Sequence, residues 1–111
     1  MKIGFDWGGV LDEFGEHFAQ IASALRKDGH QVYVISAVEP GNEAYQKSFI
    51  SPQFADCDEV ITVGAMWEDQ PKAKLVACQE KGIEWFFDDR EDTNILLRHY
   101  GIMAFTVKRL G

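Results

Sequence analysis

Carboxylates and glycines at the ends of short apolar runs are the residues of this chain that could do chemistry. The first apolar run ends at Asp6 and turns at once through Gly8 and Gly9. A glycine turn of this kind lets backbone N–H groups face an anion beside the carboxylate. Asp88 and Asp89 follow another apolar run nearer the C-terminus. Two adjacent carboxylates repel each other unless a cation joins them, so this pair predicts a metal site.

An alternation of strands and helices must position these residues. Apolar residues recur at helical spacing from Phe18 to Leu25, and near-continuous apolar runs of four to six residues indicate buried parallel strands. Residues 7–15 are expected to form a loop. The predicted strands cover residues 2–6, 31–36, 59–63, 83–88 and 102–107, and the predicted helices cover residues 16–28, 43–50, 71–81 and 92–99.

Strand and helix alternate throughout the chain, which predicts an α/β fold with a parallel sheet covered on both faces. Ligands bind at the carboxyl ends of the strands in such folds. The ends of the first four predicted strands carry Asp6, Ser36, Gly64 and the pair Asp88-Asp89. At 111 residues and 46 % apolar composition, we expect residues 1–111 to form a single domain around this edge.

Composition argues against several classes of partner. The net charge of -7 opposes long-range capture of nucleic acid or an anionic membrane. No apolar stretch approaches the roughly 18 residues of a membrane span, and no secretory apolar segment opens the chain. Cys57 and Cys78 lack CxxC spacing, which indicates reduced thiols and argues against a zinc site. We therefore expect a cytoplasmic protein without membrane or nucleic-acid partners.

The first apolar run and its glycine turn resemble the first motif of the haloacid dehalogenase (HAD) superfamily. That motif is an apolar strand followed by Asp-x-Asp-Gly-(Thr/Val)-(Leu/Ile). Four residues match it: Asp6, Gly9, Val10 and Leu11. Gly8 stands where the second Asp of the motif would be. The resemblance implies that Asp6 is a nucleophile and that the acid-base group of the family is missing from its usual position.

The second and third HAD motifs also have counterparts. Ser36 matches the second motif, whose hydroxyl binds the phosphoryl group. The third motif is a lysine near the start of the helix before the fourth strand, and Lys72 and Lys74 both qualify by spacing. If Leu75 and Val76 mark the side that faces the sheet, Lys72 shares that side and Lys74 lies nearly opposite. We therefore expect Lys72 to act on the phosphate.

Asp88 and Asp89, with Asn94 five residues further on, match the fourth HAD motif. The resemblance implies that Asp89 binds the metal and that Asp88 holds the lysine and shapes the site. Asp6 and the backbone carbonyl of Gly8 would complete the metal ligands. Mg²⁺ suits such a site because it prefers oxygen ligands and needs only one or two carboxylates plus a phosphate oxygen.

The resemblance also implies an architecture. It is a three-layer, Rossmann-like, HAD-type fold with a five-stranded parallel sheet in the order 3-2-1-4-5. No segment is long enough for the cap domain that encloses the substrate in many relatives, since residues 7–15 and 37–58 are too short. A response-regulator receiver domain would need its acidic pair after the first strand, and a dinucleotide-binding fold would need G-x-G-x-x-G. Neither pattern is present.

The expected function is that of a Mg²⁺-dependent phosphomonoester hydrolase acting through an aspartyl-phosphate. General acid-base catalysis is typically worth about 10² to 10⁴ in rate, so Gly8 predicts lowered activity unless Asp12 or Glu13 substitutes. The alternative is a weak or inactive HAD-like domain that binds a phosphorylated ligand or a protein. A dehalogenase is the weakest reading, because that branch needs a cap. The substrate is either a large phosphorylated molecule or a small one enclosed by a second subunit.

Overall fold

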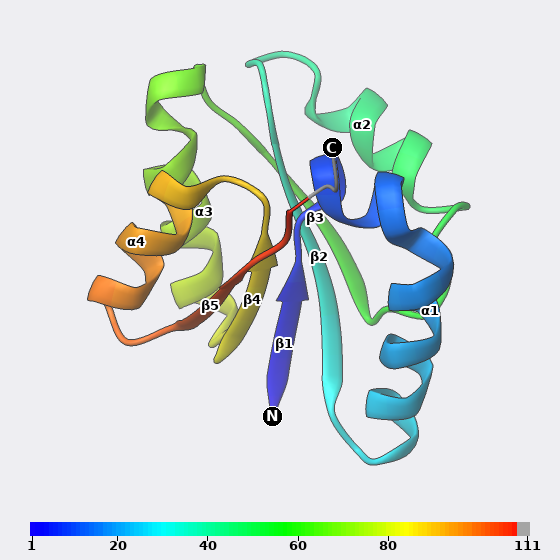
Figure 1. The fold of residues 1–111 in the computed structure, drawn as a ribbon. Coiled ribbons are helices and arrows are strands. Elements are labelled where there is room, and N and C mark those ends of the chain that lie inside the picture. Colours follow the sequence, from blue (N-terminus) through cyan, green and yellow to red (C-terminus); the bar gives the residue numbers. More distant parts are fainter. Residues whose placement is uncertain (109–111) are drawn as a thin grey trace.

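The computed structural model describes residues 1–108, which form one five-stranded, all-parallel sheet with helices on both faces (Figure 1). The strand order is β3-β2-β1-β4-β5, as predicted, and the fold is Rossmann-like. The strands are β1 (Lys2–Phe5), β2 (Gln31–Val38), β3 (Glu59–Gly64), β4 (Trp85–Asp88) and β5 (Met103–Thr106). The α-helices are α1 (Asp12–Lys27), α2 (Glu43–Ile50), α3 (Gln70–Lys81) and α4 (Glu91–His99).

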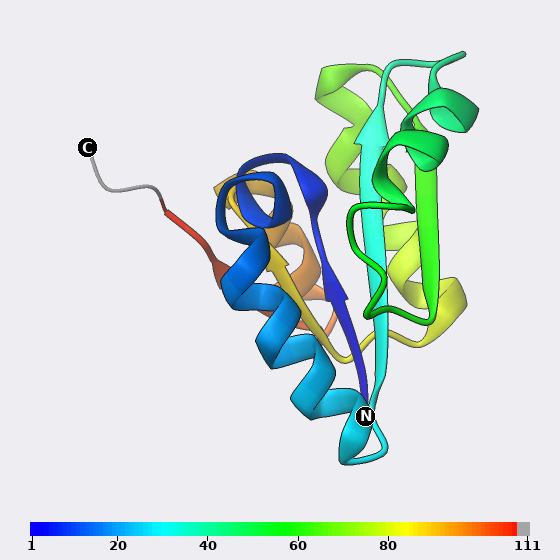
Figure 2. The same cartoon turned by 90° about the vertical axis from the view of Figure 1, so that its right-hand side faces the viewer.

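Two apolar clusters, one on each side of the sheet, hold the layers together. Helices α1 and α2 cover one face and α3 and α4 cover the other, and Figure 2 views the molecule from the side of α1 and α2. On that side Phe5 stacks on Phe87 at a centroid distance of 5.0 Å and packs against Phe18 at 5.3 Å. The opposite cluster joins Leu75 and Leu97 to the other face of the sheet. Burial of these side chains is the main driving force for the fold.

The connection from β1 to α1 differs from the predicted loop. Residues Trp7–Leu11 form a short helical turn interrupted by two glycines, and α1 begins at Asp12, four residues before the predicted start at 16. The Asp12 carboxylate accepts a hydrogen bond from the Gly9 N–H at 2.7 Å, which ties the start of α1 to the turn. The chain therefore leaves β1 and enters α1 through a tight, ordered connection.

Two of the three tryptophans lie at the surface. Trp7 is buried, but Trp67 is 65 % exposed and Trp85 is 37 % exposed. Trp67 lies in a short helical turn, Trp67–Asp69, between β3 and α3, where neither apolar cluster reaches it. This turn lies at the same edge of the sheet as the end of β1.

The described residues hold one sheet without an inserted domain after β1 or β2. Among residues 1–108, none of the helices has both the length and the apolar character needed to cross a bilayer. Cys78 is buried and Cys57 is half-buried, both as free thiols.

Candidate functional site

Three carboxylates meet at the carboxyl ends of β1 and β4. Asp6, Asp88 and Asp89 each offer an oxygen atom, and these oxygens all lie within 4.8 Å of one another. The cluster forms because β1 and β4 are adjacent parallel strands, so their ends lie at the same edge. Asp6 and Asp88 are buried, whereas Asp89 is exposed. This arrangement offers oxygen ligands to a hard cation that approaches from solvent.

Lys74 of α3 lies between the two buried carboxylates. Its Nζ is 2.7 Å from Asp88 Oδ2 and 3.0 Å from Asp6 Oδ1. Burial by itself lowers the pKa of Lys74, but the charges of Asp6 and Asp88 outweigh it and hold the pKa above its ordinary value. The lysine is therefore charged and fixed in position beside Asp6.

The expected placement of Lys72 is wrong. Lys72 is exposed and does not line the site, whereas Lys74 is buried in it. The buried stripe of α3 consists of Pro71, Lys74, Leu75 and Cys78, joined by Ala77. Val76, taken as a marker of the face toward the sheet, is 46 % exposed. The spacing i, i+3, i+4, i+7 from Pro71 was the sequence signal that identifies Lys74, since the lysine completes an otherwise apolar stripe.

The Asp6 carboxyl has an unusual electrostatic environment. Burial raises its pKa to about 8, Lys74 opposes this rise and Asp88 adds to it. Its Oδ1 also accepts a hydrogen bond from the Trp7 N–H at 2.9 Å. Burial and the neighbouring Asp88 likewise raise the pKa of Asp89. One lysine does not offset this concentration of negative charge, so a divalent cation at the carboxylates would favour their ionised forms.

The two glycines after Asp6 have different structural roles. Gly9 has φ of 74°, and a Cβ there would overlap the Asp89 carboxylate. Gly8 has φ of -66° and ψ of 125°, values open to any residue, and no atom lies within 4 Å of its Cβ position. Gly9 is therefore required for the close approach of the turn to Asp89, whereas the backbone at Gly8 does not require glycine.

A pocket of about 540 Å³ opens over these groups. Seven residues already discussed line it: Asp6, Gly8, Gly9, Ser36, Lys74, Asp88 and Asp89. Ser36 is buried and lies two residues before the end of β2, which extends beyond the predicted end to Val38. The structure thus brings together every predicted site residue except Lys72.

Trp67 and Arg90 also line the pocket, and sequence reasoning gave no role to Arg90. The Arg90 guanidinium lies over the Trp67 ring, 3.7 Å from its centroid. The backbone N–H of Arg90 donates a hydrogen bond to Asp88 Oδ1 at 2.9 Å. Asn94 is buried and donates from Nδ2 to the Asp88 carbonyl at 3.0 Å, so it holds the end of β4 in place. Arg90 directly follows the acidic pair in the sequence, and this position could have indicated that it lies close to the pocket.

Comparisons with known proteins support the fold of this chain and do not identify its family. No protein-family profile matches the chain, and no curated protein matches it. A chain of a solved Pnkp1/Rnl/Hen1 complex superposes with a TM-score of 0.72 at 16 % identity, over 96 % of this chain and 45 % of that one. This chain thus spans less than half of that relative. A universal stress protein in complex with cAMP superposes with a TM-score of 0.61 at 11 % identity, over 97 % and 98 % of the two chains.

Proposed function

We propose that the protein is a Mg²⁺-dependent phosphomonoester hydrolase of the HAD type, with Asp6 as its nucleophile. The observation that carries the proposal is the cluster at Asp6, where Lys74 lies 3.0 Å from one oxygen and two further carboxylates lie within 4.8 Å. A carboxylate nucleophile, a fixed cation and a metal site at one edge are the parts that phosphoryl transfer needs. The superpositions on solved structures support the fold. Their sequence identities are too low to bear on function, so the proposal rests on this site.

The donor set of the cluster fits Mg²⁺. Asp88 is already engaged by the Lys74 ammonium and the Arg90 N–H, whereas Asp89 is exposed. We therefore assign Asp6 and Asp89 as carboxylate ligands, with the Gly8 carbonyl as a third ligand, and assign Asp88 to hold Lys74. The bound metal would supply charge neutralisation for the phosphoryl oxygens.

The reaction follows from the position of each side chain. An Asp6 carboxylate oxygen attacks phosphorus, the bond from phosphorus to the ester oxygen breaks, and the departing oxygen takes up a proton. Water then attacks the phosphorus of the aspartyl-phosphate, which releases inorganic phosphate and regenerates Asp6. Lys74 and the Ser36 hydroxyl offset and orient the charge on the transferred group. Each group lies in the same pocket of about 540 Å³.

Asp12 is the residue best placed to replace the missing acid. It lines the pocket, and its carboxylate is held by the Gly9 N–H at 2.7 Å. Glu13, the other candidate, lines a neighbouring groove and not the pocket. We assign Asp12 as the group that protonates the departing oxygen and then accepts a proton from water.

A phosphate-release screen with Mg²⁺ tests the proposal. The wild type should hydrolyse aryl phosphates, and hydrolysis should be lost in Asp6→Asn, which keeps the size of the side chain and removes the nucleophile. An Asp6→Asn variant that folds and hydrolyses aryl phosphates as fast as the wild type would remove Asp6 from the reaction.

The absence of an acid at position 8 has its own test. Gly8→Asp should fold, because the backbone there is ordinary and the Cβ position is open. It should raise turnover of alkyl phosphates more than that of aryl phosphates, by up to about 10² in rate, because poor leaving groups depend most on protonation. Gly8→Ala is the matched control and should not raise turnover. If Gly8→Asp folds and binds Mg²⁺ yet hydrolyses no ester faster, the missing Asp is not what limits the protein.

A non-catalytic role is the second candidate. Glycine at the acid-base position favours it, and so do Met66 and Trp67, which are 55 % and 65 % exposed in the segment between β3 and α3. On this alternative the cluster holds a phosphorylated ligand, and the exposed side chains contact a protein or a second subunit. Binding of a phosphate ester with Mg²⁺ but without any turnover would favour it.

A further inference from the structure

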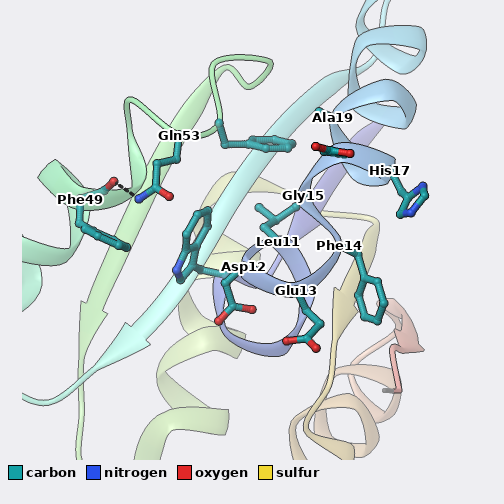
Figure 3. Close-up of a pocket in the computed structure, with 12 residues that line it drawn as sticks. Leu11, Asp12, Glu13, Phe14, Gly15, His17, Ala19, Phe49 and Gln53 are labelled. Carbon is teal, nitrogen blue, oxygen red and sulfur yellow. Dashed lines mark hydrogen bonds between the residues drawn. The ribbon is translucent and has the colours of Figure 1, made fainter. Parts of the chain in front are cut away.

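A groove of about 720 Å³ lies beside the pocket, between the start of α1 and the end of α2 (Figure 3). Phe49 and Gln53 line it from the side of α2, and Asp12, Glu13 and Phe14 line it from the side of α1. Gln53 Nε2 donates to the Phe49 carbonyl at 2.8 Å, which holds the chain beyond α2 in place. This hydrogen bond therefore holds the α2 wall of the groove together locally.

Aromatic side chains form much of the groove. Trp7, Phe49 and Phe54 line it together with Phe14. The Trp7 and Phe49 rings meet edge to face, at a centroid distance of 6.2 Å and an angle of 90°. Phe49 is 48 % exposed, although it lies among the aromatic side chains of the groove. Ring faces and edges of this kind bind apolar groups, and ring faces also attract cations.

The charge of the groove is negative. Three carboxylates line it, from Asp12, Glu13 and Glu16, and neither lysine nor arginine is among the lining residues. His17 is the one basic side chain there, at the surface of α1. An anionic group would be repelled at this position, whereas an organic cation would meet both aromatic rings and carboxylates.

The groove adjoins the pocket. Trp7 and Asp12 line both hollows. Trp7 directly follows the nucleophile Asp6, and its N–H donates to the Asp6 carboxylate at 2.9 Å. A molecule with its phosphoryl group at Asp6 can therefore extend past Trp7 into the groove.

We propose that this groove binds the leaving group of the substrate, and that the leaving group is an alcohol that carries an organic cation. The proposal rests on the proposed hydrolase function and adds the substrate class. The phosphoryl group lies at Asp6 and Lys74, while the ammonium group lies against Trp7 and Phe49 in the groove that Glu16 also lines. The substrate is thus a zwitterion whose two charges are recognised in adjacent hollows.

Three phosphate esters test this proposal in the presence of Mg²⁺. The leaving group of phosphocholine is cationic, that of 3,3-dimethylbutyl phosphate is its neutral isostere, and that of phosphoglycolate is anionic. We expect kcat/KM for phosphocholine to exceed that for the neutral isostere by about tenfold or more, since a desolvated cation-π contact is worth about that factor. Phosphoglycolate should be the poorest substrate.

Variants of the groove locate the effect. Glu16→Gln and Phe49→Leu should each reduce the preference for phosphocholine over its neutral isostere by about threefold or more. Glu80→Gln, which makes the same change in net charge on the exposed surface of α3, should keep the wild-type preference. Loss of the preference in Glu80→Gln as well would mean that net charge, and not the groove, selects the cation.

The outcomes separate this inference from the hydrolase proposal. Hydrolysis of an aryl phosphate without preference between phosphocholine and its isostere overturns the inference and leaves the hydrolase intact. If no ester is hydrolysed, the hydrolase proposal fails, and NMR titration of the Trp7 indole with choline and with 3,3-dimethylbutanol decides the cation site. Tighter binding of choline supports recognition of a cation by the groove, and equal binding of the two alcohols overturns it.

Discussion

At the scale of single residues, the position of Lys74 organises the site. Its ammonium group contacts Asp88 at 2.7 Å and Asp6 at 3.0 Å, and all three side chains are buried. Removing one partner of a buried ion pair leaves a charge without compensation, which costs far more than loss of an exposed pair. Lys72, half a turn away on the same helix, is exposed and provides a natural comparison.

Lys74→Met and Lys72→Met should therefore behave differently. We expect Lys74→Met to lower the free energy of unfolding by about 3 to 5 kcal/mol, because Asp6 and Asp88 lose their shared cation. Lys72→Met should change it by less than about 0.5 kcal/mol. Urea denaturation of the two variants beside the wild type measures both values. Equal stability of all three proteins would contradict the buried ion-pair arrangement.

Residue types at strand ends pointed to Asp6, Asp88 and Asp89 as site residues, because an apolar run that stops at a carboxylate is visible in the sequence. Ser36 was assigned through its match to the second HAD motif. The choice between the two lysines was wrong because Val76 was taken as buried. It is an exposed apolar residue beside the buried stripe of α3. A single apolar residue on the outer face of a short helix is enough to rotate a predicted face by half a turn.

At the scale of elements, the connection between β1 and α1 brings the backbone close to the carboxylates. Gly9 has φ of 74°, and its Cβ position is occupied by the Asp89 carboxylate. Gly8, its neighbour, has an ordinary backbone conformation and an open Cβ position. The sequence predicted a glycine turn here, but it could not show which glycine the turn requires.

Alanine at each position separates the two roles. Gly9→Ala should cost about 1 to 3 kcal/mol of stability, because a non-glycine residue is strained at this φ and displaces Asp89. Gly8→Ala should stay within about 0.5 kcal/mol of the wild type. Thermal unfolding measures both, and Mg²⁺ titration should show weakened binding in Gly9→Ala. The reverse order of stabilities would show that the turn is built differently.

At the scale of the whole molecule, the strand order brings distant segments together. The order β3-β2-β1-β4-β5 is the one that the resemblance to the HAD superfamily implied, and the alternation of strands and helices had predicted only a parallel α/β sheet. It places β4 beside β1, so Asp88 and Asp89 reach Asp6 from the other end of the chain. The contact of Arg90 with Trp67 joins the segment between β4 and α4 to the segment between β3 and α3. Hydrophobic periodicity carries no information about contacts of this kind.

Binding of Mg²⁺ at this junction should stabilise the whole fold. A ligand that binds the folded state alone raises its stability by mass action, by about 2.7 kcal/mol at 100 times its Kd, or roughly 10 °C in Tm for a domain of this size. Asp89→Asn should largely lose this shift. Asp28→Asn, at the end of α1 and at the opposite edge of the sheet, should keep it. Equal Mg²⁺ shifts in all three proteins would remove Asp89 from the metal site.

The proposed reaction requires that Asp6 becomes phosphorylated during turnover. The most direct measurement is acid quenching of the wild type with an aryl phosphate and Mg²⁺, followed by mass spectrometry of the peptide that contains Asp6. We expect a phosphate on Asp6 in the wild type and none in Asp6→Asn. Steady hydrolysis with no phosphate on that peptide, and undiminished hydrolysis by Asp6→Asn, would contradict it.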